Sequence, residues 1–346
     1  MKLRIIRVDL PLKHVFETSQ RSVSVVRTIL VELEQDGLRG HGEAYEDKLY
    51  NAYIEDMVDV LEECRESVEH YALADPVAFW RTLQPMLKKN PFVQSAVDCA
   101  ACDLWGKMKN KPLWKIWGLS IDHVPDSSYT IGLDSLERIA DRMAENPDWA
   151  IYRVKLGCKS DLQILQMLRE KTKAPFHVDV NGGWNIETAI KRLEPMKELG
   201  VELLEQPLPA DNFTGITRLK KEMKKRNCSI PIIADESWQT ETDIERCAGS
   251  GLFDGINLKL VKCGGLIPAR QLIAKAKHLG LKLTSANSIE STVGASAISQ
   301  LAPLLDHISI DGPLLIEKKV GTGVRTEKGK LVYPNENGTG VRVPFR

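Results

Sequence analysis

Short apolar runs that each close on a charged residue recur along the middle of the chain. Each run is four or five residues long, as a buried strand is, and a stretch of helical period separates most of them from the next. They recur at intervals of roughly 24 to 30 residues, which is the length of a strand, a loop, a helix and a return loop. The runs are Tyr152–Lys155, Phe176–Asp179, Val201–Glu205, Ile232–Asp235 and Ile256–Lys259. A repeated strand–helix unit predicts parallel strands whose charged ends lie at one common edge.

Three further strands complete a pattern of eight. Ser128–Gly132 precedes the repeat, and Leu281–Ser285 and His307–Asp311 follow it. Amphipathic segments such as Glu187–Leu199 and Pro268–Leu279 predict helices between the strands. The pattern predicts a (β/α)8 barrel of the TIM type, in which side chains at the carboxyl ends of the strands converge on one pocket.

The N-terminal third predicts a second module of the α+β class. Three alternating segments, 3–10, 23–33 and 38–43, predict antiparallel strands, and helical patterning follows from residue 52 to 109. Two polar connections, 14–22 and 44–51, are interpreted either as a mobile lid or as surface loops without a role. We expect an N-terminal capping domain over 1–120, the barrel over 121–315, and a glycine-punctuated tail over 316–346 that returns to complete the capping domain.

Composition narrows the class of protein. Lys plus Arg and Asp plus Glu both number 47 among 346 residues, so no net field favours nucleic acid or an anionic membrane. No apolar run reaches the roughly 18–20 residues of a membrane span, and we expect no secretory signal at the start. Seven scattered cysteines predict a reducing cytoplasm, with Cys99 and Cys102 as core residues. We expect a cytoplasmic enzyme that acts on a small molecule. The sequence is compatible with a homo-oligomer.

Acidic side chains end three successive strands of the predicted barrel, at Asp179, Glu205 and Asp235. Three carboxylates brought together repel one another unless a cation joins them. Oxygen ligands without His or Cys predict a hard ion, Mg²⁺ before Mn²⁺. Asn181 lies two residues beyond Asp179 and Glu236 directly follows Asp235, and both are predicted to support the acids.

Two lysines, Lys155 and Lys259, end the second and sixth strands and are therefore expected to lie across the barrel from each other. Arg153 points the same way as Lys155, and Asn257 points the same way as Lys259, because alternate residues of a strand lie on one face. Burial, the opposing lysine and the metal would lower an ammonium pKa toward that of a working base.

This constellation suits removal of a proton from the carbon next to a carboxylate. The metal would stabilise the enediolate, one lysine would take the proton, and the other would deliver one to the opposite face. Two opposed lysines predict a 1,1-proton transfer with inversion. If only one lysine acted as a base, β-elimination or cycloisomerisation would fit equally well.

Five motifs together resemble the enolase superfamily, specifically the muconate-lactonizing-enzyme subgroup. They are Arg153-Val-Lys155, Val178-Asp-Val-Asn181, Glu205-Gln-Pro207, Ala234-Asp-Glu-Ser237 and Asn257-Leu-Lys259. The resemblance covers essentially the whole chain. It implies that the three acids bind Mg²⁺ and that the two lysines perform acid/base catalysis.

Within the subgroup the chain looks most like the dipeptide epimerases of the L-Ala-D/L-Glu type, which hold the substrate's ammonium group with Asp-x-Asp. Here that motif is Ser309-Ile-Asp311, so one carboxylate is missing. Arg153 stands at the position of the family's first lysine and keeps the charge, but it cannot deprotonate. Glu290 is interpreted either as an amine contact or as a cap at a helix start.

The resulting prediction is a Mg²⁺-dependent dipeptide epimerase. Its expected substrate-binding residues are Thr130, Arg153, Asn257, Glu290, Ser309 and Asp311. The alternatives are an N-acylamino-acid racemase, an o-succinylbenzoate synthase or a muconate-type cycloisomerase. A binding protein that has lost catalysis is disfavoured, because all three acids and both lysines are intact.

Overall fold

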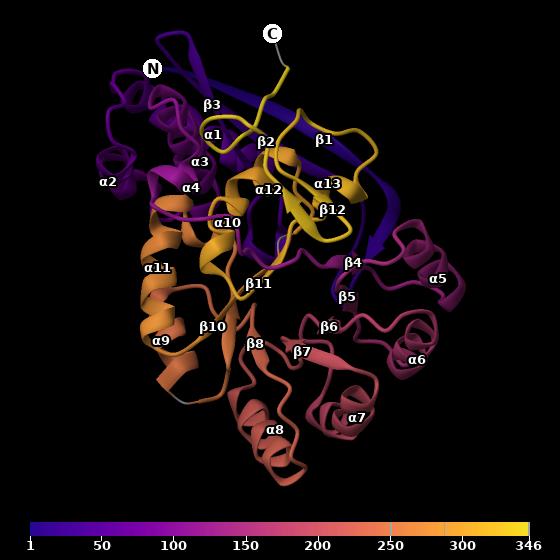
Figure 1. Ribbon diagram of the computed structural model, residues 1–346. Coiled ribbons are helices and arrows are strands. Elements are labelled where there is room, and N and C mark those ends of the chain that lie inside the picture. The colour runs from indigo at the N-terminus through magenta and orange to yellow at the C-terminus, as the bar shows by residue number, and fades with distance from the viewer. Residues whose placement is uncertain (250, 287, 345–346) are drawn as a thin grey trace.

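Eight parallel strands form a nearly closed barrel in the computed structural model, which describes residues 1–249, 251–286 and 288–344 (Figure 1). The strands follow one another around the sheet in chain order, and a bridge from Ser127 to Ile308 joins the first to the last. They are β4 (Tyr129–Ile131), β5 (Tyr152–Lys155), β6 (Phe176–Asp179), β7 (Val201–Glu205), β8 (Ile232–Ala234), β9 (Gly255–Asn257), β10 (Lys282–Ala286) and β11 (His307–Ser309). The predicted TIM-type fold class is confirmed.

Helices surround the barrel, and polar caps mark where several of them begin. Asn185 accepts a hydrogen bond from Thr188 N at the start of α7, and Asn212 accepts one from Gly215 N at the start of α8. The surrounding helices are α5 (Leu136–Glu145), α6 (Asp161–Lys171), α7 (Ile186–Glu198), α8 (Phe213–Lys225), α9 (Glu241–Gly249), α10 (Leu260–Cys263), α11 (Leu266–His278), α12 (Thr292–Ser299) and α13 (Gly312–Leu315). None of the helices within the described ranges has both the length and the apolarity that a bilayer crossing requires.

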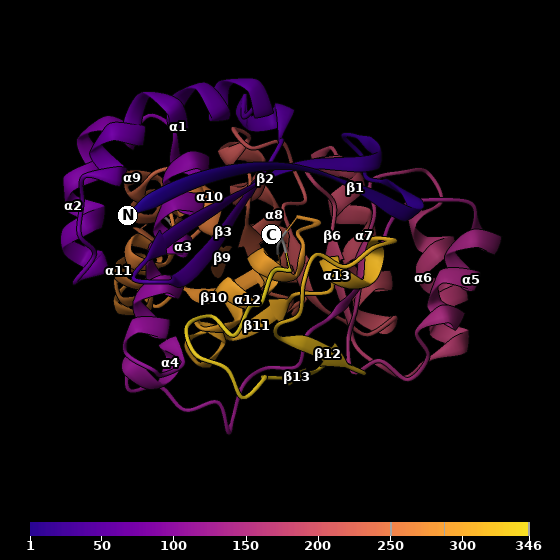
Figure 2. The same ribbon diagram turned by 90° about the horizontal axis from the view of Figure 1, so that it is seen from above.

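The N-terminal unit is a three-stranded antiparallel sheet that runs across one end of the barrel (Figure 2). Helix α3 packs directly on β3, because Gly42 offers no side chain there: a Cβ at Gly42 would lie 2.0 Å from Ala96 O. The elements are β1 (Lys2–Glu17), β2 (Ser22–Gln35), β3 (Leu38–Tyr45), the 3₁₀ turn η1 (Lys48–Tyr50), α1 (Ile54–Glu69), α2 (Pro76–Leu87), α3 (Pro91–Met108) and α4 (Leu113–Ile116).

The connection between β1 and β2 is shorter than the sequence predicted. The expected loop over 14–22 is wrong, because β1 continues to Glu17 and pairs there with Ser22, so that only residues 18–21 lie between the two strands. The register shifts between Pro11 and Phe16, so the strand carries an irregularity and then resumes pairing. The lid candidate is therefore a tight four-residue tip.

Two carboxylates of the N-terminal unit hold the first turns of barrel helices. Glu43 on β3 accepts hydrogen bonds from Ser291 N at 3.0 Å and Gly294 N at 2.9 Å, at the start of α12. Asp98 on α3 accepts one from Ile267 N at 3.0 Å, at the start of α11. Because the first N–H groups of a helix lack partners inside it, these acids tie the two units together.

The C-terminal segment returns to the N-terminal unit. Leu12 on β1 bridges to Ile316, and Leu113 N donates to Gly338 O at 2.8 Å. Asp103 on α3 accepts from Thr339 N at 2.8 Å. A small hairpin, β12 (Arg325–Glu327) with β13 (Lys330–Val332), lies within this segment, and Figure 1 shows the segment near the N-terminal sheet.

Candidate active site

A cavity of about 800 Å³ opens between the carboxyl ends of the barrel strands and the N-terminal unit. Its barrel side carries seven of the residues that the sequence singled out: Thr130, Arg153, Lys155, Asn181, Glu236, Lys259 and Asp311. Its other side comes from β1, β2 and the segment 45–50. The three acids lie beneath this lining and are buried, with Asp179 0%, Glu205 2% and Asp235 1% exposed.

The two lysines reach the cavity from separate strands. Lys155 ends β5 and Lys259 follows β9, so four steps of the strand order separate them. Each contacts a different acid: Lys155 Nζ donates to Asp179 Oδ2 at 2.5 Å, and Lys259 Nζ donates to Asp235 Oδ2 at 2.6 Å. The sequence-based expectation that acids on the intervening strands separate two amines agrees with this arrangement.

The three acids form a row in which each neighbouring pair shares a donor. Arg153 contacts Asp179 and donates to Glu205 Oε2 at 2.8 Å. Asn257 Nδ2 donates to Glu205 Oε1 at 2.6 Å and contacts Asp235 Oδ2 at 3.4 Å. Glu205 is thus the central acid, and the guanidinium and the amide occupy the spaces on either side of it.

Burial and the two neighbouring acids raise the pKa of Glu205 to about 7. Burial acts in the same direction on Asp179 and Asp235, but the adjacent lysines outweigh it and lower the pKa of both carboxyls. Mutual repulsion among the acids is what a bound cation would relieve.

The donor set fits a hard divalent cation, since it consists of buried carboxylates on successive strands. Across the described part of the chain, no three carboxylate, imidazole or thiol side chains already meet around one point, because Arg153 and Asn257 lie between the acids. Asp179, Glu205 and Asp235 would hold such an ion, with Arg153 and Asn257 as their neighbours.

The two lysines differ in their electrostatic surroundings. Burial lowers the pKa of Lys155, and the charge of Arg153 lowers it further, against the opposing effect of Asp179. Burial also acts to lower the pKa of Lys259, but Asp235 and nearby tyrosines outweigh it and raise the value well above normal. The surroundings of the two amines therefore shift their pKa values in opposite directions.

Asn181 and Glu236, both predicted to support the acids, join the two sides of the site. Lys155 Nζ donates to Asn181 Oδ1 at 3.0 Å, and Asn181 Nδ2 donates to Glu236 Oε1 at 3.1 Å. Sequence reasoning did not single out Gln206, whose Oε1 accepts from Asp235 N at 3.0 Å. The sequence feature that could have identified Gln206 is its position within the Glu205-Gln-Pro207 motif.

The end of the eighth strand forms a hydroxyl-rich cluster around Asp311. One of its carboxylate oxygens accepts from Thr130 N at 2.6 Å, and the other accepts from Ser309 Oγ at 2.7 Å and Thr130 Oγ1 at 3.3 Å. Ser309 thus contacts the remaining acid of the motif rather than the main cavity. Glu290 is buried and does not appear in the lining of that cavity among the described residues, and Ser291 and Glu43 cap α12 instead.

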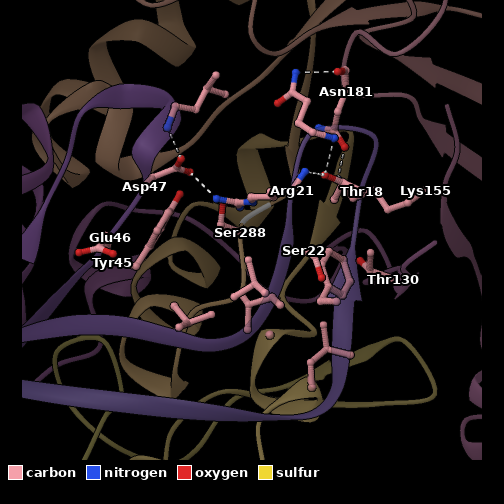
Figure 3. Close-up of a pocket in the computed structure, with 18 of the residues that line it drawn as sticks. Thr18, Arg21, Ser22, Tyr45, Glu46, Asp47, Thr130, Lys155, Asn181 and Ser288 are labelled. Carbon is pink, nitrogen blue, oxygen red and sulfur yellow. Dashed lines mark hydrogen bonds and ion pairs between the residues drawn. The ribbon is translucent and has the colours of Figure 1, made fainter. Parts of the chain in front are cut away.

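Residues 18–21, the tip between β1 and β2, contact the barrel beside Lys155 (Figure 3). Ser19 Oγ donates to Val180 O at 2.7 Å, and Gln20 Nε2 donates to Asn181 O at 2.7 Å. Arg21 reaches across to Asp47, with Nη1 and Oδ2 3.1 Å apart, as Figure 3 shows. Residues 18–21 therefore close over one edge of the cavity in this structure.

Ser19 fits a notch formed by two glycines of barrel loops. A Cβ at Gly183 would lie 2.8 Å from Ser19 Cβ, and one at Gly157 would lie 2.7 Å from it. Gly183→Ala should displace residues 18–21 from the barrel. Alanine can adopt the backbone conformation of Gly183, but its Cβ would collide with Ser19. We expect faster amide hydrogen exchange at residues 18–22, measured by mass spectrometry.

The matched control is Gly249→Ala, where an added Cβ meets nothing within 4 Å. Exchange at residues 18–22 should equal that of the wild type in this control. Unchanged protection in Gly183→Ala would show that the glycine notch does not hold the tip.

Comparison with known proteins agrees with this architecture. Residues 1–118 match the mandelate racemase / muconate lactonizing enzyme N-terminal domain, and residues 135–345 match the enolase C-terminal domain-like family. The chain therefore belongs to the mandelate racemase / muconate lactonizing enzyme group of the enolase superfamily, which confirms the resemblance inferred from the motifs.

Named relatives extend over the full chain. An L-Ala-D/L-amino acid epimerase of Flavobacterium johnsoniae is 41% identical over 99% of each chain, and one of a Maribacter species is 40% identical over 99% of each chain. Among solved structures, a dipeptide epimerase of Methylococcus capsulatus, complexed with Mg and the dipeptide L-Arg-D-Lys, is 26% identical over 99% of each chain with a TM-score of 0.88.

Proposed function

We propose that the protein is a Mg²⁺-dependent epimerase of dipeptides, an isomerase that inverts the carbon next to the terminal carboxylate. The observation that carries this proposal is the position of Lys155 and Lys259, which line one cavity from strands four apart with three buried acids between them. Full-length similarity to named epimerases supports the same class.

In the proposed reaction Lys155 removes the α-proton and Lys259 delivers a proton to the opposite face; in the reverse direction the roles exchange. Asp179, Glu205 and Asp235 would hold Mg²⁺, which supplies Lewis-acid stabilisation of negative charge on the substrate carboxylate when bound. Asn181 orients Lys155 through its hydrogen bond at 3.0 Å.

Asp311 is the proposed partner of the dipeptide's ammonium group. It lines the cavity, and an ionised carboxylate offers about four acceptor positions, of which Thr130 and Ser309 occupy three. One position remains for an amine. The occupation of most acceptor positions of Asp311 by Thr130 and Ser309 also favours a second candidate, racemisation of N-succinylated amino acids. An acylated nitrogen carries no charge that needs a carboxylate.

A panel of L-Ala-L-X dipeptides and N-succinyl amino acids, incubated with the protein and Mg²⁺ in D₂O, tests the proposal. We expect deuterium at the α-carbon of the dipeptide's C-terminal residue together with formation of its epimer. Turnover of the succinylated amino acids alone would favour the second candidate. Exchange with neither class would contradict both.

A further inference from the structure

Lys262 is a second buried cation on Asp235 that the proposed chemistry does not use. Its side chain is 2% exposed, and its Nζ donates to the backbone carbonyl of Asp235 at 2.7 Å and to Oδ1 at 3.1 Å. Lys259 contacts the other carboxylate oxygen, Oδ2. Each oxygen of the Asp235 carboxylate therefore accepts a hydrogen bond from a different lysine.

Two aromatic rings lie near the Lys262 ammonium. Its Nζ lies 4.0 Å from the centroid of Trp238 and 5.8 Å from that of Tyr50. Trp238 is itself held by a hydrogen bond from Nε1 to Asn257 O at 3.1 Å. A desolvated cation over an indole face is strongly attracted to it, so Lys262 has a fixed position.

The two lysines differ in their access to substrate. Lys259 lines the cavity, whereas Lys262 does not appear in its lining among the described residues. The hydrogen bond from Lys259 to Asp235 changes in strength whenever Lys259 gains or loses a proton in the proposed reaction. Asp235 then needs another partner that stays in place, and Lys262 meets that requirement.

We propose that Lys262 is a positioning residue that holds Asp235 by its carbonyl and Oδ1, so that Oδ2 stays turned toward Asn257 and Glu205. Asn257 contacts both Glu205 Oε1 and Asp235 Oδ2, which places Oδ2 on the side of the central acid. The inference rests on the proposed function, because it assigns Lys262 to the orientation of a Mg²⁺ ligand.

Charge and positioning lead to opposite expectations, which makes the inference testable. Removing a positive charge beside a metal ligand would by electrostatics alone strengthen Mg²⁺ binding. Loss of the group that orients the ligand would weaken it, by about 10- to 100-fold for comparable partners of metal ligands.

The test is Lys262→Met, a neutral side chain of similar length, with Mg²⁺ affinity measured by titration calorimetry on the full chain. We expect Mg²⁺ to bind at least about 10-fold more weakly, and at saturating Mg²⁺ we expect kcat to fall while KM for the dipeptide is little changed. Lys275→Met on the outer helix α11 is the matched control and should behave as the wild type. If thermal unfolding shows that Lys262→Met does not fold, Lys262→Gln carries the same test.

Mg²⁺ affinity that stays within about twofold of the wild type, or that increases, would overturn the positioning role. A wild-type chain that binds Mg²⁺ but epimerises no dipeptide would contradict the proposed substrate alone, and calorimetry would still decide the role of Lys262. A wild-type chain that binds no Mg²⁺ would overturn the proposed function and this inference with it.

Discussion

Lys155→Ala and Lys259→Ala should each abolish epimerisation, with a loss of more than about 10³-fold, within the range that positioned acid–base groups contribute. The physical reason is that inversion needs a proton removed on one face and a proton supplied on the other. The two amines are held by separate acids, Asp179 and Asp235, so neither can take over the position of its counterpart. The measurement is the rate of epimer formation with a dipeptide and Mg²⁺.

Deuterium exchange resolves which lysine serves which face. In D₂O each variant should fail to exchange the α-hydrogen of one epimer. That epimer is the one whose α-hydrogen points toward the lysine that was removed. Lys275→Ala, a change to a lysine on the outside of α11, is the control and should leave both rates intact. If either active-site variant formed epimer at near the wild-type rate, the two-base scheme would be wrong.

Glu205→Gln should weaken Mg²⁺ binding by more than about 100-fold, beyond the loss that follows removal of an outer partner of a metal ligand. Glu205 is the central acid of the row, and it accepts from Arg153 on one side and Asn257 on the other. Its replacement by a neutral amide also leaves the Arg153 guanidinium less compensated. Calorimetric titration with Mg²⁺ measures the change directly, and dipeptide epimerisation should fall with it.

Glu202→Gln is the matched control for this change. Glu202 lies on the same strand, β7, but it points outward and is exposed. Its variant should bind Mg²⁺ as the wild type does. Equal Mg²⁺ affinity in Glu205→Gln and the wild type would remove Glu205 from the proposed ligand set.

Sequence reasoning was strongest where one residue type recurred at one position of a repeat. The strands that end at Lys155, Asp179 and Glu205 have the predicted bounds, because a short buried strand between amphipathic helices has a clear pattern. It was weakest at the β1–β2 tip. There strand pairing resumes at Phe16 and Glu17 beyond a register irregularity that composition does not signal, and only residues 18–21 connect the two strands.

The linear order of residues by itself determined the barrel, the order of its strands, and the presence of acids and amines at their carboxyl ends. Strand pairing follows chain order, so the pattern was sufficient for these. Only the tertiary structure decided the partners of each charge: Arg153 between two acids, Lys262 behind Asp235, and Ser19 in its glycine notch. Such contacts depend on side-chain rotamers and on close approach between segments far apart in the chain, and periodicity gives only the face on which a side chain lies.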